Sequence, residues 1–336
     1  MNFEYSDPQT EIEEFFGGFF HISAFGRIEP GDQEKFREFL HRTAPPPRTV
    51  VYIDSIGGDV DAAMGIGRLI RQCWFSTSIG TYLLQPQHQS DLIVPREHTC
   101  GKCISSATLV YLGGRLRFYT AGSEFGVHQF SFKNPTAESI YHSQRLSASI
   151  AAYIAEMGIP AAFLELSAGT SGDKVTFVSE AQLKELGVIT GGMTKPIWGV
   201  EIQQNAMWVR AERDSLWGHG KVILIYSPTD GFTFAALVES MGRENDLMSF
   251  PLVEIVVNGE DRRINISDRC IRAPAGIYTI LMSKLLNDEA QMLAHSESFG
   301  IQIRASAQSE IFLGIAAVST AGAEAKLQGL YKLGTA

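Results

Sequence analysis

Cysteine, positive charge and long apolar runs are all scarce in this chain of 336 residues. Four cysteines are too few for a disulfide scaffold, and Cys100 and Cys103 form the only close pair. A zinc site would need two further ligands, and although His98 lies nearby, the sequence has no second CxxC or HxxxH motif. Two ordinary thiols and a redox pair remain as interpretations. No metal or other cofactor is expected.

Positive charge does not accumulate in either half of the sequence. The net charge of −9 divides into −6 up to Thr194, from 15 basic and 21 acidic residues, and −3 beyond it, from 13 basic and 16 acidic residues. Nucleic acid and anionic membrane surfaces are therefore not expected as partners.

Neither a membrane span nor a signal peptide is expected in the chain. No run approaches the ~20 apolar residues of a membrane span. The acidic start, MNFEYSDPQTEIEEFF, lacks the basic and apolar regions of a signal peptide. The expected location is the cytoplasm, with the periplasm as the alternative if the chain is the processed form of a longer protein.

The composition is that of a globular protein with cores to bury. Hydrophobic residues make up 45% of the chain and charged residues 19%. At roughly 100–200 residues per domain, the length predicts two domains. We expect an N-terminal tail over 1–19, an α/β domain over 20–194 and a mostly-β domain over 195–336, joined through the glycine- and proline-containing segment 191–196.

Strand and helix signals alternate in the first domain. The β-branched run Thr49–Asp54 is typical of a buried parallel strand, and it ends at the glycine turn Ser55–Asp59. A helix is expected from there to Cys73, followed by a strand over 76–80, which together form a βαβ unit. Residues 83–99 do not continue this alternation of strand and helix signals and are predicted to be an inserted surface loop.

Alternating strands dominate the second domain. The expected elements are strands over 232–239, 252–259 and 299–305 and one helix over 284–296. This pattern is typical of a β-sandwich or barrel, and we expect a binding or assembly module. Trp198, Trp208 and Trp217 either line a ligand or partner surface or pack in the core or between the domains.

Three features of the first domain suit acyl-transfer chemistry. Glycines at the end of a strand, here Gly57 and Gly58, turn backbone N–H groups outward, as stabilisation of an oxyanion requires. Ser105 stands in a small-residue turn that opens a buried helix, the place of an activated hydroxyl or of a helix cap. His128 lies in an apolar strand, where histidine is either a general base or a core residue.

Taken in order, these segments resemble the proteolytic subunit of the Clp protease. The resemblance rests on Tyr52–Asp59, Gly101–Ala107 with the following Gly113-Gly114, Val127–Gln129 and Phe177–Ile189. It extends from Phe20 to Thr190, apart from the insertion, and is strongest to bacterial Clp-like proteins with Cys-x-Ser at the nucleophile turn. It implies a ClpP/crotonase-like spiral of βαβ units, a peptide or protein substrate, and homo-oligomers that interlock through the long helix 136–157. The apolar residues of this helix would also suit ordinary packing within one chain.

The resemblance also implies catalytic roles. Ser105 would be the nucleophile and His128 the general base of a serine peptidase, with the N–H groups of Gly58 and Ser106 in the oxyanion hole.

The sequence departs from the family pattern at two places. Ser171 stands in the register of the family's aspartate, so Asp173 is predicted to orient His128, with an exposed loop aspartate as the alternative. Ser106 stands where the family usually has methionine. The second departure leaves the side-chain specificity near the nucleophile open. Ser171 and the large second domain keep open a catalytically weak or inactive oligomeric scaffold or sensor with a C-terminal binding domain. A crotonase-type acyl-CoA enzyme, which would need neither Ser105 nor His128, ranks last.

Overall fold

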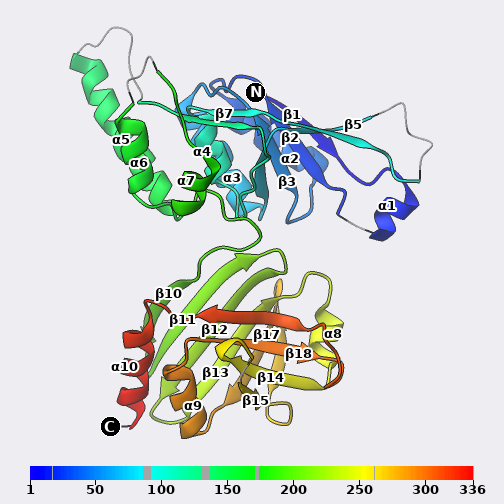
Figure 1. Cartoon of the computed structure of the whole chain (residues 1–336), viewed down its shortest axis with the longest axis vertical. Helices are drawn as coiled ribbons and strands as arrows, with labels where there is room; N and C mark the ends of the chain where they lie inside the picture. Colours follow the sequence, from blue (N-terminus) through cyan, green and yellow to red (C-terminus); the bar gives the residue numbers. More distant parts are fainter. Residues whose placement is uncertain (17, 86–91, 130–136, 171–173, 261, 336) are drawn as a thin grey trace. The chain divides into compact units, whose positions relative to one another are not determined.

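The computed structural model describes the whole chain except residues 17, 86–91, 130–136, 171–173, 261 and 336. The chain divides into two compact units, Met1–Gly192 and Met193–Ala336, each with its own hydrophobic core (Figure 1). The division falls inside the glycine-containing segment 191–196. The first unit is mixed α/β and the second is rich in strands.

A four-stranded sheet in the order β1-β2-β3-β4 forms the base of the first unit. Its strands are β1 (Asn2–Ser6), β2 (His21–Phe25), β3 (Val50–Asp54) and β4 (Ser76–Ile79). β2, β3 and β4 are parallel, and β1 is antiparallel to β2. The parallel strands are connected by α2 (Asp32–Thr43) and α3 (Val60–Gln72), as the βαβ pattern predicts.

A second, three-stranded sheet carries the segments of the proposed site. Its strands are β7 (Lys102–Ile104), β8 (Glu124–Val127) and β9 (Thr176–Phe177). The helices that accompany it are α4 (Ala107–Leu112), α5 (Ala137–Glu156), α6 (Ala162–Ala168) and α7 (Glu180–Glu185). Parallel bridges between Ser55 and Cys103 and between Thr77 and Arg117 join the end of the first sheet to this part of the chain.

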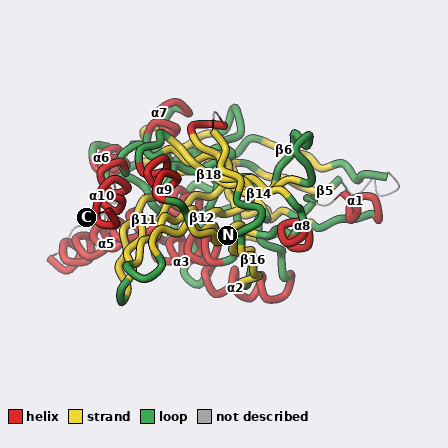
Figure 2. The backbone as a smooth tube through the Cα atoms, turned by 90° about the horizontal axis from the view of Figure 1, so that it is seen from below, coloured by secondary structure: helices red, strands yellow, loops and turns green. Residues whose placement is uncertain are grey.

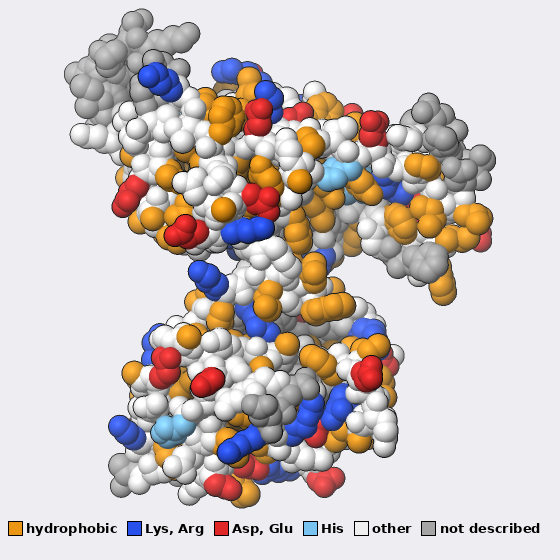
Figure 3. Space-filling model, in the orientation of Figure 1, with side chains coloured by type: hydrophobic (Ala, Val, Ile, Leu, Met, Phe, Trp, Pro, Cys, Tyr) orange, Lys and Arg blue, Asp and Glu red, His pale blue; other side chains and the backbone are white. Residues whose placement is uncertain are grey.

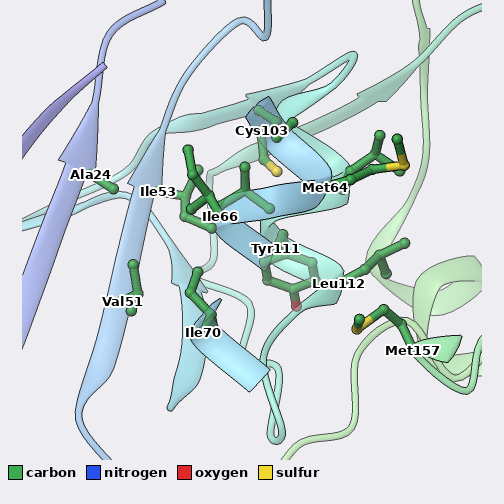
Figure 4. Close-up of a cluster of buried hydrophobic side chains, with 14 of the residues drawn as sticks. Ala24, Val51, Ile53, Met64, Ile66, Ile70, Cys103, Tyr111, Leu112 and Met157 are labelled. Atoms are coloured by element: carbon green, nitrogen blue, oxygen red, sulfur yellow. The ribbon is translucent and has the colours of Figure 1, made fainter. Parts of the chain in front are cut away.

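The core of the first unit lies between the four-stranded sheet and the helices. Ile53 from β3 meets Ile66 and Ile70 from α3, and Tyr111 from α4 lies against them (Figure 4). All four side chains are fully buried. Burial of a side chain of this size stabilises the fold by about 1.5–3 kcal/mol, so this contact fixes α3 and α4, and with them the turns that precede both helices.

Residues 1–19 are not a tail. β1 pairs with β2 along its whole length, and α1 (Glu11–Phe16) follows it. Phe3 packs on Phe36 of α2 with ring centroids 4.7 Å apart. The segment belongs to the sheet and core because β1 pairs with β2 and Phe3 packs on α2, contacts between segments far apart in sequence.

The segment 83–99 also differs from the expected loop, because both of its ends are strands. β5 (Thr81–Leu84) and β6 (Arg96–Thr99) form an antiparallel hairpin. Arg96 makes a buried ion pair with Glu13, 2.7 Å from guanidinium nitrogen to carboxylate oxygen. The hairpin is therefore tied to the start of the chain by a contact that local sequence patterns do not reveal.

The second unit consists of two antiparallel sheets around one core. The six-stranded sheet has the order β10-β11-β12-β13-β17-β16 and the four-stranded sheet the order β15-β14-β18-β19. The strands are β10 (Ile197–Gln203), β11 (Ala206–Ser215), β12 (Gly218–Ser227), β13 (Gly231–Glu239), β14 (Leu252–Val257), β15 (Arg262–Asn265), β16 (Ile271–Ala275), β17 (Tyr278–Lys284), β18 (Ser298–Arg304) and β19 (Leu313–Ser319). Both sheets contribute side chains to the core, among them Val222, Phe234, Ile255 and Ile301.

The described part of this unit contains three α-helices where the sequence predicted one. They are α8 (Glu244–Ser249), α9 (Asn287–Ala294) and α10 (Glu324–Thr335). α9 and α10 pack together (Figure 2). α9 is the expected helix. The other two escape local analysis because α8 has only six residues and α10 carries two glycines, which lower helix propensity.

The three tryptophans of the second unit do not form one surface. Trp198 faces the core, where its ring lies 5.9 Å from that of Phe299 and its Nε1–H donates to the Ser319 carbonyl at 3.0 Å. Trp208 pairs across the strands with Glu201, three residues along β10 from Trp198, so it lies on the opposite face of the sheet. Trp217 is 83% exposed in the β11–β12 turn.

Acidic and basic side chains are interspersed on the face shown in Figure 3, and neither sign forms a continuous field there. Among the helices that the structure describes, none is long and apolar enough to cross a membrane.

Candidate active site

The glycine turn after β3 lies directly against Ser105. Gly57 and Gly58 have φ angles of 90° and 148°, a region that favours glycine. A Cβ on Gly57 would lie 2.8 Å from the Cβ of Ser105, and a Cβ on Gly58 would lie 1.9 Å from the Ile28 carbonyl oxygen. Asp59 then caps α3 by accepting the Ala62 N–H at 2.8 Å. Both glycines are required by this close approach.

Ser105 occupies a tight turn between β7 and the buried helix α4. Its φ of 61° is left-handed, a strained conformation for a serine. The turn is held by the Ser105 N–H, which donates to the Gly126 carbonyl at 2.9 Å, and by the Thr108 hydroxyl, which donates to the Ser105 carbonyl at 2.7 Å. A serine on a strained strand-to-helix turn is the arrangement that presents a nucleophilic hydroxyl in many hydrolases.

His128 follows the end of β8, the strand beside β7. In their parallel register Ile104 pairs with Gly126, so Ser105 and His128 both leave the sheet at the same edge. The His128 Nδ1 lies 2.9 Å from the Gln129 carbonyl oxygen. When Nδ1 carries the proton and donates it to this carbonyl, Nε2 is left as the basic nitrogen.

Ser105 and His128 line one small pocket, which is partly open to solvent. The other lining residues are mostly apolar and come from α4, α5 and α6, among them Leu109, Ile150, Ile154, Phe163 and Leu164. The two side chains, both in the described part of the chain, are not hydrogen-bonded to each other. Such contacts are often loose before substrate binds.

Asp173, the predicted acid, and Ser171, which stands in the register of the aspartate of the family that the sequence resembles, lie outside the described residues. The residues on either side of them are described, and both are held beside the strand that carries His128. The Thr170 carbonyl accepts the Gln129 N–H at 2.9 Å, and Thr176 pairs with Val127. Thr170 and Thr176, which flank the segment 171–175, therefore both lie next to His128 in the structure.

The predicted oxyanion donors differ in their hydrogen bonding. The Gly58 N–H donates to the Ser106 hydroxyl at 2.7 Å, and that hydroxyl donates to the Gly58 carbonyl at 3.1 Å. The Gly57 N–H donates to the Ser55 hydroxyl at 3.1 Å. Within the described part of the chain, no acceptor is found for the Ser106 N–H. Of the two expected donors, the Gly58 N–H is therefore occupied by a side chain.

The cysteines near the site are not bonded to each other. Cys103 is buried beneath the turn, and burial, followed by the nearby Asp54 carboxylate, raises the pKa of its thiol well above the usual value. Cys100 is exposed, and its thiol donates to the Ala121 carbonyl at 3.2 Å. Among the described residues, no group of three or more potential ligands is placed to hold a metal ion.

A scan against protein-family models finds no family that matches the chain, and a search of curated proteins finds no matching relative.

Sequence reasoning missed two features of this site. The first is the role of the Ser106 side chain, since only its backbone N–H was assigned. The signal for it is that the family that the sequence resembles usually has a methionine at this position. The second is the Gln129 carbonyl, a backbone group that no sequence motif identifies.

Proposed function

We propose that the first unit is a serine peptidase of the Clp protease type, which cleaves peptide-type acyl bonds. The observation that carries this proposal is Ser105, held at φ 61° in a strand-to-helix turn and sharing a pocket with His128. The ClpP/crotonase-like spiral is part of the proposal. It is supported by the parallel strands β2, β3 and β4 with their connecting helices.

In the proposed reaction, the Ser105 Oγ attacks the carbonyl carbon of the scissile bond while the His128 Nε2 accepts the hydroxyl proton. The tetrahedral intermediate expels the amine, which takes that proton, and leaves an acyl-enzyme. A water molecule then loses a proton to the same imidazole and attacks the acyl carbon, which releases the acid and restores Ser105. The intermediate's oxyanion is stabilised by the N–H groups of Gly58 and Ser106.

The imidazole is oriented from its Nδ1 side. The Gln129 carbonyl fixes the proton on Nδ1, and we include Asp173 as the carboxylate that stabilises the imidazolium. The anchored residues Thr170 and Thr176 support this choice, because they bring both ends of its segment to His128.

The proposal includes a preference for a peptide with an apolar side chain next to the scissile bond, because the residues around the pocket are mostly apolar. Ile150 and Ile154 of α5 and Phe163 of α6 provide a lining without charged groups. The proposal also includes a homo-oligomer, because the family resemblance assigns the long helix to subunit contacts. Sedimentation velocity measures the number of subunits directly.

Fluorophosphonate labelling tests the proposal. We expect labelling that is lost in Ser105→Ala and slowed at least 100-fold in His128→Ala, since general base catalysis contributes about 10²–10⁴. Ser179→Ala is the matched control, because the Ser179 hydroxyl caps α7 outside the pocket. Labelling that persists in Ser105→Ala would contradict the assignment of Ser105 as the nucleophile.

One observation favours the alternative, a Clp-like scaffold or sensor without efficient hydrolysis. Because the Gly58 N–H donates to the Ser106 hydroxyl, it is not available to an oxyanion in this conformation. Complete absence of labelling and of peptide hydrolysis, in a folded protein, would support this second function.

A further inference from the structure

Ser106 is fully buried directly after the proposed nucleophile, and its hydroxyl bonds twice to the glycine turn. Its Oγ accepts the Gly58 N–H at 2.7 Å and donates to the Gly58 carbonyl at 3.1 Å. The Ser106 Oγ thus occupies the acceptor position of the Gly58 N–H. A substrate oxygen and this hydroxyl cannot both accept that N–H in a good geometry.

The glycine turn itself has little freedom to move. The Ile28 N–H donates to the Gly57 carbonyl at 3.0 Å, and the Asp59 N–H donates to the Ile28 carbonyl at 2.9 Å. Gly58 lies so close to Ile28 that a single added Cβ would overlap its carbonyl. The Ser106 side chain, by contrast, needs one rotation about its Cα–Cβ bond to leave the Gly58 N–H, since serine has three staggered rotamers.

We propose that the Ser106 hydroxyl is a latch that holds the hydrolase in a latent state, and that it rotates off the Gly58 N–H when an acyl substrate binds. This inference rests on the proposed function of Ser105. Ser106 acts through Gly58 and is a positioning residue.

Removing the hydroxyl frees the N–H and tests the latch. In fluorophosphonate labelling, the Ser105 Oγ forms a bond to phosphorus, fluoride leaves, and the phosphoryl oxygen takes the place of the oxyanion. We expect Ser106→Ala to label about tenfold faster than the unchanged protein, a difference that corresponds to about 1.4 kcal/mol in the barrier.

Ser123→Ala is the matched control. The Ser123 hydroxyl is also buried, accepts a glycine N–H, from Gly101 at 3.2 Å, and lies 3.4 Å from a carbonyl, that of Ile79. It lies outside the site, so its loss is expected to leave the labelling rate unchanged. Ser55→Ala frees the Gly57 N–H instead and is not expected to accelerate labelling.

Hydrogen exchange at the Gly58 amide gives a second measurement that needs no reaction. The amide is expected to be protected in the unchanged protein and to exchange about tenfold faster in Ser106→Ala, with the thermal unfolding of both proteins recorded to confirm that they are folded. A Gly58 amide that exchanges equally fast in both proteins would overturn the latch.

The remaining outcomes separate the two proposals. Labelling of Ser105 that is unchanged or slower in Ser106→Ala overturns the latch and makes the hydroxyl a support of the turn. Acceleration in Ser55→Ala alone also overturns it, because Gly57 would then be the donor. No labelling of Ser105 in any of these folded proteins overturns the proposed function and the latch together.

Discussion

Glu13 and Arg96 form a buried ion pair, and breaking it is expected to destabilise the first unit strongly. The two side chains are 0% and 2% exposed. The Glu13 carboxylate accepts hydrogen bonds from both terminal guanidinium nitrogens, at 2.7 and 2.8 Å, and from the Gln9 and Val94 N–H groups, each at 2.7 Å. Glu13→Gln keeps the size of the side chain but leaves the Arg96 guanidinium buried without its counter-ion.

The expected loss is about 3–5 kcal/mol of unfolding free energy, the usual cost of removing one partner of a buried ion pair. The pKa of Glu13 gives a second figure. Hydrogen bonds from Arg96, and then from the Gln9 and Val94 N–H groups, lower this pKa from 4.5 to about 2 against the opposing effect of burial. At about 1.4 kcal/mol per pH unit, this difference corresponds to about 3 kcal/mol.

The sign of the pKa change sets the pH range. Because the folded pKa lies below the unfolded value, this stabilisation is complete above pH 4.5 and is lost as the pH falls towards about 2. The assay is denaturant unfolding at pH 7, with amide exchange of β1 and β2 to report on the first unit. Glu156→Gln is the control, because its pair with Arg68 is exposed (41% and 47%) and is worth less than about 1 kcal/mol. A loss for Glu13→Gln no larger than this control would refute the reasoning.

Three further predictions follow from burial and close contacts. Burial, and then the Arg96 charge, lower the pKa of His21 from 6.5 to about 4. The unfolding free energy is therefore expected to fall by about 3 kcal/mol as the pH is lowered from 6.5 to about 4, and His21→Phe should reduce this pH dependence in denaturant unfolding. Gly67→Ala places a Cβ 1.9 Å from the Tyr153 hydroxyl of α5. Although alanine is the better helix former, this substitution is expected to lower the unfolding free energy by about 1–3 kcal/mol in the same assay. A gain in stability would contradict the packing of α5 on α3. Trp217→Ala should change stability by less than about 0.5 kcal/mol, because the side chain is 83% exposed; a larger loss would show that it packs in the folded protein.

The parallel strands and helices of the first unit could be predicted because their signals are local. The β-branched run that becomes β3, the glycines that end it and the helix that follows all lie within a short stretch of sequence. β1 and the β5–β6 hairpin could not be predicted in this way. β1 depends on its pairing with β2 and on the packing of Phe3 on Phe36, and the hairpin depends on the contact between Glu13 and Arg96, which lie 83 residues apart.

The same limit applies to the site. Ser105 and His128 were predicted from a resemblance, and the parallel register of β7 and β8 then gives the physical reason why they meet at one edge. The bond from the Gly58 N–H to the Ser106 hydroxyl could not be predicted, because it joins residues 48 apart whose approach depends on the folded turn.

The most direct test of the central claim is the site of covalent modification. Mass spectrometric mapping of the protein after fluorophosphonate treatment is expected to place the adduct on the peptide that contains Ser105, at that residue. An adduct on another residue, or none on a folded protein, would contradict the account.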